Sequence, residues 1–252
     1  MAARLHLTES PVQTTLLAWP RAVLVCALAL PGCASFAPVV DEPLRVGNVA
    51  DPAPEALGYR AGITGFDEAR ETLSARGYTG VVADVFAPEG GPLLGVVAAD
   101  YQSRVHVFRG GVYDRSLVVP SEGLPPYGMA LRIARDGPAT RLLVLYRDPL
   151  DRAAYPPMLL SFEWRADHFE LATRTSLADV ASRHRGMTHP VLLGDDLADG
   201  VLLVARDAGG KLWDTSYFVR MPGGRVALEA RPMNDALRCS CVQKYAFDVA
   251  RR

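Results

Sequence analysis

The sequence contains few cysteines, little lysine and almost no net charge, and these shortages exclude several classes of protein. Four cysteines in 252 residues are too few for a disulfide framework. The 27 basic and 28 acidic residues nearly cancel, so there is no electrostatic case for binding nucleic acid. Only Lys211 and Lys244 are lysines, a bias that indicates genomic composition and no particular chemistry.

Signatures of catalysis and metal binding are missing as well. The chain has no Gly-x-Ser-x-Gly motif, which positions the nucleophile in many hydrolases. His184 and His189 are five residues apart, which does not match the His-x-x-x-His spacing of zinc sites. His106 and His168 fall within expected strands or turns and are assigned no role. We therefore expect no catalytic residue, no cofactor site and no metal site, and the sequence favours a protein that is not an enzyme.

The apolar run near the N-terminus is too short to cross a membrane. It covers residues 22–30, whereas a spanning helix needs roughly 20 residues. Arg4 and Arg21 precede the run and small residues follow it, which is the order of a secretory signal peptide. The sequence therefore predicts an exported protein.

The end of this run, Leu30-Pro31-Gly32-Cys33, resembles the bacterial lipobox, although Pro31 departs from the usual small residue. The resemblance implies cleavage before Cys33 and attachment of acyl groups such as palmitate to that cysteine, which makes residues 1–32 the signal peptide. Ala34 differs from the aspartate of the inner-membrane retention signal, which indicates the outer membrane, on either of its faces. The alternative is an ordinary secretory signal peptide that happens to contain Cys33.

Cleavage at this point leaves a mature chain of 252 − 32 = 220 residues, enough for one large domain. Residues 33–60 are rich in proline and small residues, so we expect a lipid anchor followed by an extended tether. Residues 61–252 then form the folded domain. It is expected to begin with a helix over residues 66–76, with Phe66, Ala69 and Leu73 on one face and Gly77 as its end.

Three apolar runs closed by an aspartate repeat along this domain. They end at Asp100, Asp148 and Asp207, at intervals of 48 and 59 residues (148 − 100 and 207 − 148). Shorter apolar runs flank each of them: upstream at 81–85, 129–133 and 190–194, and downstream at 105–108, 158–164 and 212–218, followed by runs that start at Val112, Phe169 and Val226. Each unit therefore predicts four antiparallel strands, and the chain an all-β fold.

The units resemble the FG-GAP and VCBS repeats of β-propeller proteins over about 150 residues. The resemblance implies a β-propeller-like array of three to four four-stranded units. Those families often hold calcium in a loop rich in aspartate, and only the third loop here, with Asp195, Asp196 and Asp199, is acidic. The alternative is that any antiparallel sheet yields apolar runs that end in aspartate.

Two further segments complete the domain. Residues 176–184 predict a short inserted helix capped by Ser176. Residues 237–249 alternate between apolar and polar side chains, which predicts a half-buried strand that closes the array together with N-terminal chain. On such a strand Cys239 and Cys241 lie on one face, as buried thiols or, alternatively, as a soft-metal or redox pair.

The sequence favours a membrane-anchored envelope lipoprotein whose propeller-like domain is a binding or scaffold module. Its partners would be the membrane, through the lipid, and an envelope protein or glycan. The competing hypothesis is a periplasmic hydrolase or lyase that acts on glycans, with its acid and base on separate loops.

Four aromatic residues lie in expected strands, where they serve either as core or as a ligand surface. They are Trp164, Trp213, Tyr217 and Tyr245.

Overall fold

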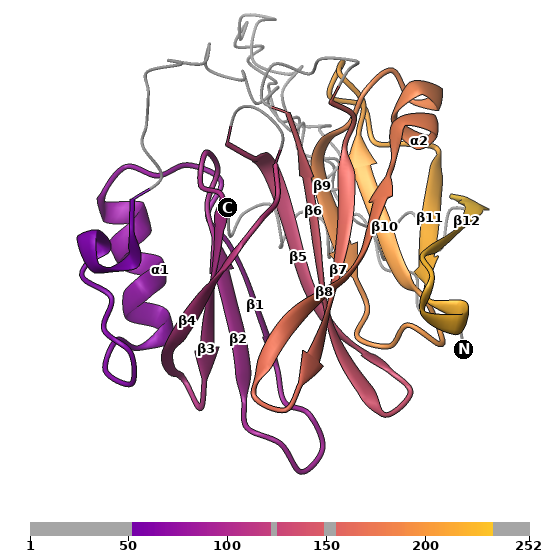
Figure 1. Cartoon of the computed structure of the whole chain (residues 1–252). Helices are drawn as coiled ribbons and strands as arrows, with labels where there is room; N and C mark the ends of the chain where they lie inside the picture. The colour runs from indigo at the N-terminus through magenta and orange to yellow at the C-terminus, as the bar shows by residue number, and fades with distance from the viewer. Residues whose placement is uncertain (1–51, 122–124, 149–154, 234–252) are drawn as a thin grey trace, which may run out of the picture. The chain divides into compact units, whose positions relative to one another are not determined.

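The protein is mostly β-structure and contains three four-stranded antiparallel sheets. The computed structural model describes residues 52–121, 125–148 and 155–233. Each sheet uses one continuous stretch of chain, so the colour in Figure 1 changes from sheet to sheet. Within every sheet the strands lie in the order of the sequence. The chain therefore builds the same meander three times.

The bounds of the elements follow the predicted units. Sheet A contains β1 (Val82–Phe86), β2 (Leu94–Ala98), β3 (Arg104–Arg109) and β4 (Val112–Val118). Sheet B contains β5 (Tyr127–Asp136), β6 (Ala139–Arg147), β7 (Met158–Arg165) and β8 (His168–Ser176). Sheet C contains β9 (Thr188–Leu193), β10 (Val201–Arg206), β11 (Thr215–Arg220) and β12 (Ala227–Pro232). The helical elements of the described chain are η1 (Pro54–Leu57), α1 (Phe66–Ala75), α2 (Ala178–Arg183) and η2 (Pro222–Gly224). None of the helices in these residues is long and apolar enough to span a membrane.

The three runs that end in aspartate are β2, β6 and β10, the second strands of the three sheets. Their equivalent positions confirm that expectation, and the flanking runs supply the other strands of each sheet. Several bounds shift by up to three residues, and among them β11 begins at Thr215 and not at Leu212. Trp213 donates its backbone N–H to Ala205 O at 3.0 Å and buries its ring, which holds this segment outside the regular strand.

The closing aspartates are structural. Asp100 is buried, and its Oδ1 accepts the N–H of Gly128 at the start of sheet B, at 2.8 Å. Asp207 Oδ1 accepts the N–H groups of Gly209 and Lys211, at 2.9 and 3.0 Å, which holds the turn after β10. A carboxylate suits this position because it accepts several hydrogen bonds from backbone N–H groups.

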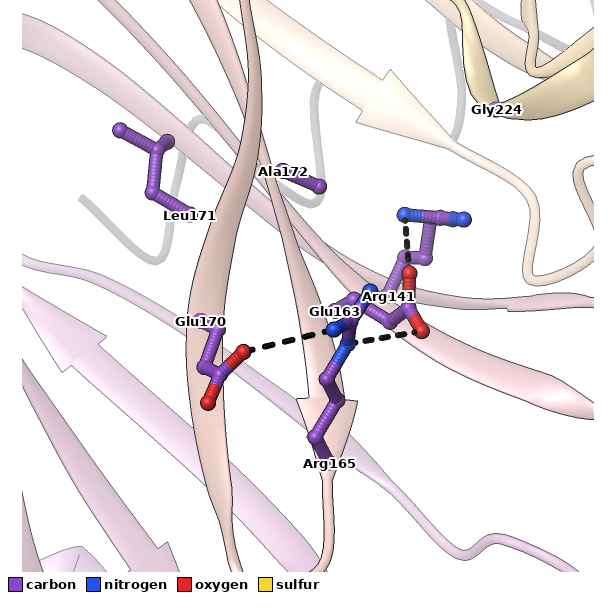
Figure 2. A pocket seen from close by; sticks show the side chains of 7 residues that line it. All are labelled: Arg141, Glu163, Arg165, Glu170, Leu171, Ala172 and Gly224. Carbon is purple, nitrogen blue, oxygen red and sulfur yellow. Dashed lines mark hydrogen bonds and ion pairs between the residues drawn. The ribbon is translucent and has the colours of Figure 1, made fainter.

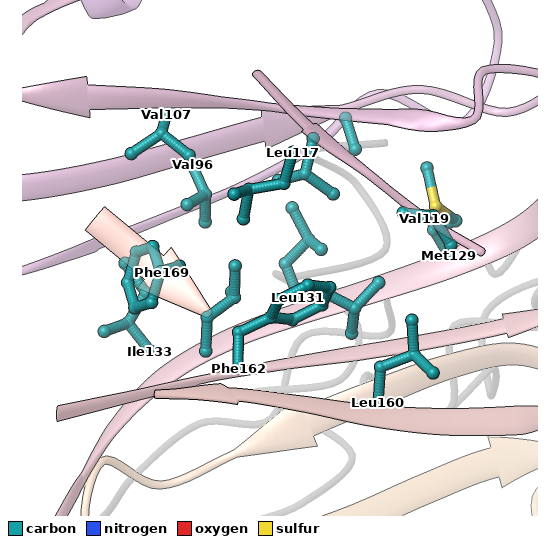
Figure 3. Close-up of a cluster of buried hydrophobic side chains, with 14 of the residues drawn as sticks. Val96, Val107, Leu117, Val119, Met129, Leu131, Ile133, Leu160, Phe162 and Phe169 are labelled. Carbon is teal, nitrogen blue, oxygen red and sulfur yellow. The ribbon is translucent and has the colours of Figure 1, made fainter. Parts of the chain in front are cut away.

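An apolar layer joins sheets A and B. Alternate residues of facing strands meet there, as Figure 3 shows for Val96 and Val107 of sheet A and Leu131, Ile133 and Phe162 of sheet B. The opposite face of sheet B packs on sheet C and on α2 in a second apolar layer. Because both faces of sheet B are covered, β6 is apolar at successive positions and not at alternate ones.

The helix α1 covers the remaining face of sheet A. Its apolar side, with Ala69 and Leu73, is buried against that sheet, which confirms the predicted helix. Residues 54–59 lie there as well, although the sequence placed them in the tether. The turn η1 buries Leu57, and Tyr59 donates its hydroxyl to Ala69 O at 3.0 Å. The packed part of the chain therefore begins before residue 60.

The inserted helix is confirmed as α2, with a shifted start. Leu177 is the residue that precedes its first turn, and the Ser176 hydroxyl accepts the N–H of Ala178 at 3.3 Å. Val180 belongs to the apolar layer between sheets B and C, and Ala181 beside it is also buried. The insertion thus adds to the packing of sheet C.

Candidate functional site

Polar side chains join the first strands of the three sheets. The strand β1 lies beside β5, and β5 beside β9. Arg132 of β5 donates from Nε and Nη2 to Leu192 O of β9, at 2.9 and 2.6 Å, and its Nη1 lies 3.2 Å from Asp84 Oδ1 of β1. Asp84 Oδ2 also accepts the N–H of Ile133 at 2.6 Å. These groups bind the sheets to one another, so we assign them a structural role.

A charged hollow of about 350 Å³ lies where sheet B meets η2 (Figure 2). Strand register builds it, because Arg141 of β6 lies opposite Glu163 of β7, which in turn lies opposite Glu170 of β8. Side chains two residues apart on a strand share a face, which adds Arg165 to this row. Its lining residues are Arg141, Glu163, Arg165, Glu170, Leu171, Ala172 and Gly224.

Arginines separate the carboxylates of this hollow. Arg141 is largely buried, with Nε 2.5 Å from Asp136 Oδ2 and Nη1 3.1 Å from Glu163 Oε2. Arg165 lies between the two glutamates, with Nε 3.2 Å from Glu163 Oε1 and Nη1 3.7 Å from Glu170 Oε2 (Figure 2). Opposite charges alternate along the row, which suits a static network or the binding of an uncharged polar ligand.

The polar contacts continue toward sheet A. His168 contacts Glu170 through Nε2 at 3.1 Å and Asp167 through Nδ1 at 2.9 Å. The hydrogen bond with His168, together with the nearby charge of Arg115 on β4, lowers the pKa of Asp167. Arg115 Nη2 lies 3.4 Å from Asp167 Oδ2, and its hydrogen bond with Asp114 raises the pKa of the guanidinium. The network thus links the outermost strand of sheet A to sheet B.

An apolar hollow of about 510 Å³ lies at the start of α1. Phe66 packs edge-on against Phe108, with ring centroids 5.4 Å apart, and both line it. Gly95 of β2 makes room for this arrangement, since a Cβ there would lie 2.8 Å from Phe66 Cδ2. Val85 and Leu93 form the wall and are 47% and 43% exposed, although both are large apolar side chains.

The rim of the apolar hollow carries the acidic first turn of α1. Asp67 is exposed and pairs with Arg70 at 3.3 Å, while Glu68 Oε2 accepts the N–H of Gly65 at 3.3 Å. This hollow therefore offers apolar contact area with a polar border, the composition of a surface that binds another molecule.

His106 heads a buried hydrogen-bonded cluster that resembles a catalytic arrangement only superficially. Its Nδ1 lies 2.9 Å from Ser116 Oγ and its Nε2 3.4 Å from Gln102 Oε1, while the Tyr113 hydroxyl lies 3.0 Å from the same Oγ. Burial lowers the pKa of His106 to about 4, with a further contribution from Arg104. A fully buried imidazole that resists protonation is a poor general base, so the cluster is structural.

The acidic turn after β9 is held by an arginine. Asp196 Oδ2 lies 3.2 Å from Arg135 Nη2, and Asp196 Oδ1 accepts the N–H of Ala198 at 2.9 Å. The described residues contain no group of three or more His, Cys, Asp or Glu side chains arranged to hold a metal ion.

The remaining residues singled out in the sequence fall in three places. Cys33, Cys239, Cys241 and Tyr245 lie outside the described residues. Trp213 and Tyr217 are buried between sheets B and C, and Trp164 is partly buried beside the layer between sheets A and B. His184 stacks on Trp213, with the ring centroids 4.1 Å apart. Desolvation lowers the pKa of His184. The described aromatics thus belong mainly to the core.

No family model, no curated protein and no solved structure matches this chain.

Proposed function

We propose that the protein is a bacterial envelope lipoprotein, anchored to the outer membrane through acylated Cys33, whose folded domain is a non-catalytic binding or scaffold module. The lipobox-like sequence before Cys33 supports the anchor. The three equivalent sheets, with their first strands side by side, support a β-propeller-like array.

The apolar hollow beside α1 carries the binding part of this proposal. Val85 and Leu93 remain nearly half exposed over the apolar floor of Phe66 and Phe108. Exposed apolar side chains gathered around a hollow mark sites of interaction more often than isolated ones do. An apolar side chain of an envelope protein, or the apolar face of a glycan, fits such a floor.

Site-specific photo-crosslinking in intact cells tests the binding module. A photoreactive residue at Leu93 should give defined adducts with an envelope component. The control position is Val118 on β4, which is 63% exposed and lies outside the lining of the hollow. Adducts that are equal at both positions, or absent at Leu93, would count against a binding site in the apolar hollow.

The charged hollow favours the competing function, a glycan-acting hydrolase or lyase. Glu163 and Glu170 both line it and are joined through Arg165, so their carboxylates are near enough to flank one bond. The arginines argue for the binding module, because acid–base catalysis requires one carboxylic acid to be held neutral. Glu163→Gln and Glu170→Gln decide between the two, since each should abolish glycan cleavage in an enzyme and leave crosslinking from Leu93 unchanged in a binding module.

A further inference from the structure

The face of sheet C that points away from sheet B is apolar and buried. It carries Val191 and Leu193 of β9, Leu202 and Val204 of β10, and Met233 just after β12, each with 8% or less of its surface exposed. Antiparallel sheets commonly turn one polar face to water. The outer face of sheet C does not have this composition.

The described residues supply only one layer of this apolar cluster. Its members all come from sheet C and the residues beside its strands, with Leu212 and Phe218 at the margin. The other three clusters each join two layers: sheet A to sheet B, sheet B to sheet C, and sheet A to α1 and η1. Side chains on a single layer cannot reach this degree of burial, so another part of the chain must cover them.

The position of the chain favours the C-terminal segment as that cover. Sheet A, the first sheet, is covered by the residues that immediately precede it, in η1 and α1. Sheet C, the last sheet, is followed by residues 234–252. The segment starts beside the cluster, because Met233 belongs to the cluster and donates its N–H to Asp214 O at 2.9 Å.

The sequence of this segment supplies a matching apolar face. Between residues 237 and 249, odd-numbered positions are apolar with one exception, Gln243, and most even-numbered positions are polar or small. The apolar members are Leu237, Cys239, Cys241, Tyr245, Phe247 and Val249. Since side chains alternate across an extended strand, this pattern places them on one face.

We propose that residues 237–249 dock as extended chain on the outer face of sheet C, with Cys239 and Cys241 turned toward Val204 and its neighbours. Each half of the segment, residues 237–241 and 245–249, spans about 16 Å when extended, which fits within the roughly 20 Å of a six-residue strand such as β10. The C-terminal segment then completes for sheet C the cover that α1 provides for sheet A.

Native-state thiol labelling of the full-length protein tests this contact. Trypsin cleaves after Arg238 and Lys244, so one peptide, 239–244, reports both cysteines separately from Cys26 and Cys33. In the folded protein their alkylation should be at least about 100-fold slower than in urea, because it requires local opening. Equal rates in the two conditions would overturn the proposal.

Two matched substitutions locate the contact on sheet C. Val204→Thr places a hydroxyl on the outer face of β10, whereas Val201→Thr makes the same change on its inner face, toward sheet B. We expect Val204→Thr to accelerate labelling roughly 10-fold, because the buried hydroxyl weakens the contact with the segment. Val201→Thr should leave the native rate unchanged. If the two variants label at the same rate, the segment is protected somewhere else and the proposal is wrong.

Discussion

Replacement of Arg132 by methionine should show how much the contacts between the first strands of the three sheets contribute to the stability of the protein. Methionine keeps most of the length of the side chain and removes its hydrogen bonds. The change deletes both bonds to Leu192 O of β9 and the ion pair with Asp84 of β1. Ile133 N–H still donates to Asp84, so that carboxylate keeps this hydrogen bond.

The expected loss of stability follows from burial and charge. A hydrogen bond to a charged group contributes about 1.5–3 kcal/mol, and breaking a buried ion pair costs about 3–5 kcal/mol. Arg132 and Asp84 keep 22% and 12% of their side-chain surfaces exposed, which places the cost near the lower end. We expect a decrease of about 3 kcal/mol in the free energy of unfolding, or roughly 6–12 °C in melting temperature.

The control lies three residues further along the same strand. Arg135 is 53% exposed and forms one ion pair, 3.2 Å from Asp196, so Arg135→Met should cost less than about 1 kcal/mol. Urea titration of both variants measures the difference. In addition, Asp84→Asn should cost less in the Arg132→Met background than alone, because the carboxylate has already lost its cation. Equal losses from Arg132→Met and Arg135→Met, within about 0.5 kcal/mol, would refute a special role for the contacts of the first strands.

Three further predictions concern the anchor, the buried histidine and a tight glycine. Cys33→Ala should abolish labelling by a palmitate analogue, and equal labelling of the variant and the natural protein would exclude the lipoprotein. Burial lowers the pKa of His106 to about 4, so the folded state resists protonation of this imidazole. The full contribution of His106 to the free energy of unfolding is therefore present above pH 6.5, and it should fall by about 3 kcal/mol as the pH drops toward 4. A difference in unfolding free energy between the natural protein and His106→Asn that stays constant over this range would contradict the prediction. A Cβ on Gly80 would lie 2.0 Å from Asp100 Oδ2, whereas Gly137 has a similar positive φ and open space around it. Calorimetry should therefore find Gly80→Ala about 2 kcal/mol more destabilising than Gly137→Ala. Equal losses of stability in the two variants would mean that the clash relaxes.

The meander could be predicted from the sequence because its strongest signal is the second strand of each unit. These strands are buried at successive positions, so they appear as continuous apolar runs between turns. The segment before Thr215 could not be predicted as a loop, since Leu212 and Trp213 have the composition of a strand. The burial of Tyr59 could not be predicted for the opposite reason, because its proline-rich surroundings resemble a tether while its ring packs on Tyr113 and His106.

The contact between the first strands can be predicted from the sequence once the repeated units are aligned, although composition alone does not reveal it. Asp84 and Arg132 are the only charged residues in two apolar runs, and each is the fourth residue of its run. Opposite charges at equivalent positions of two repeated units predict a pair as soon as the units are aligned. The charged hollow left no such signal, because it depends on the register that places Arg141, Glu163 and Glu170 in one row.

The two hollows lie at the same end of their meanders, and the repeated aspartates lie at the opposite end. Each meander has turns between its first and second and its third and fourth strands at one end, and the turn between its second and third strands at the other. Leu93 and Glu170 follow turns of the first kind, whereas Asp100 and Asp207 follow the second strands and use their carboxylates on backbone groups. One end of the units is therefore occupied by contacts that hold the fold, whereas the apolar and charged side chains of the two hollows lie at the other end. Recognition by the proposed binding module is expected at that second end, where the turns can change without disturbing the aspartates or the pair of Asp84 and Arg132.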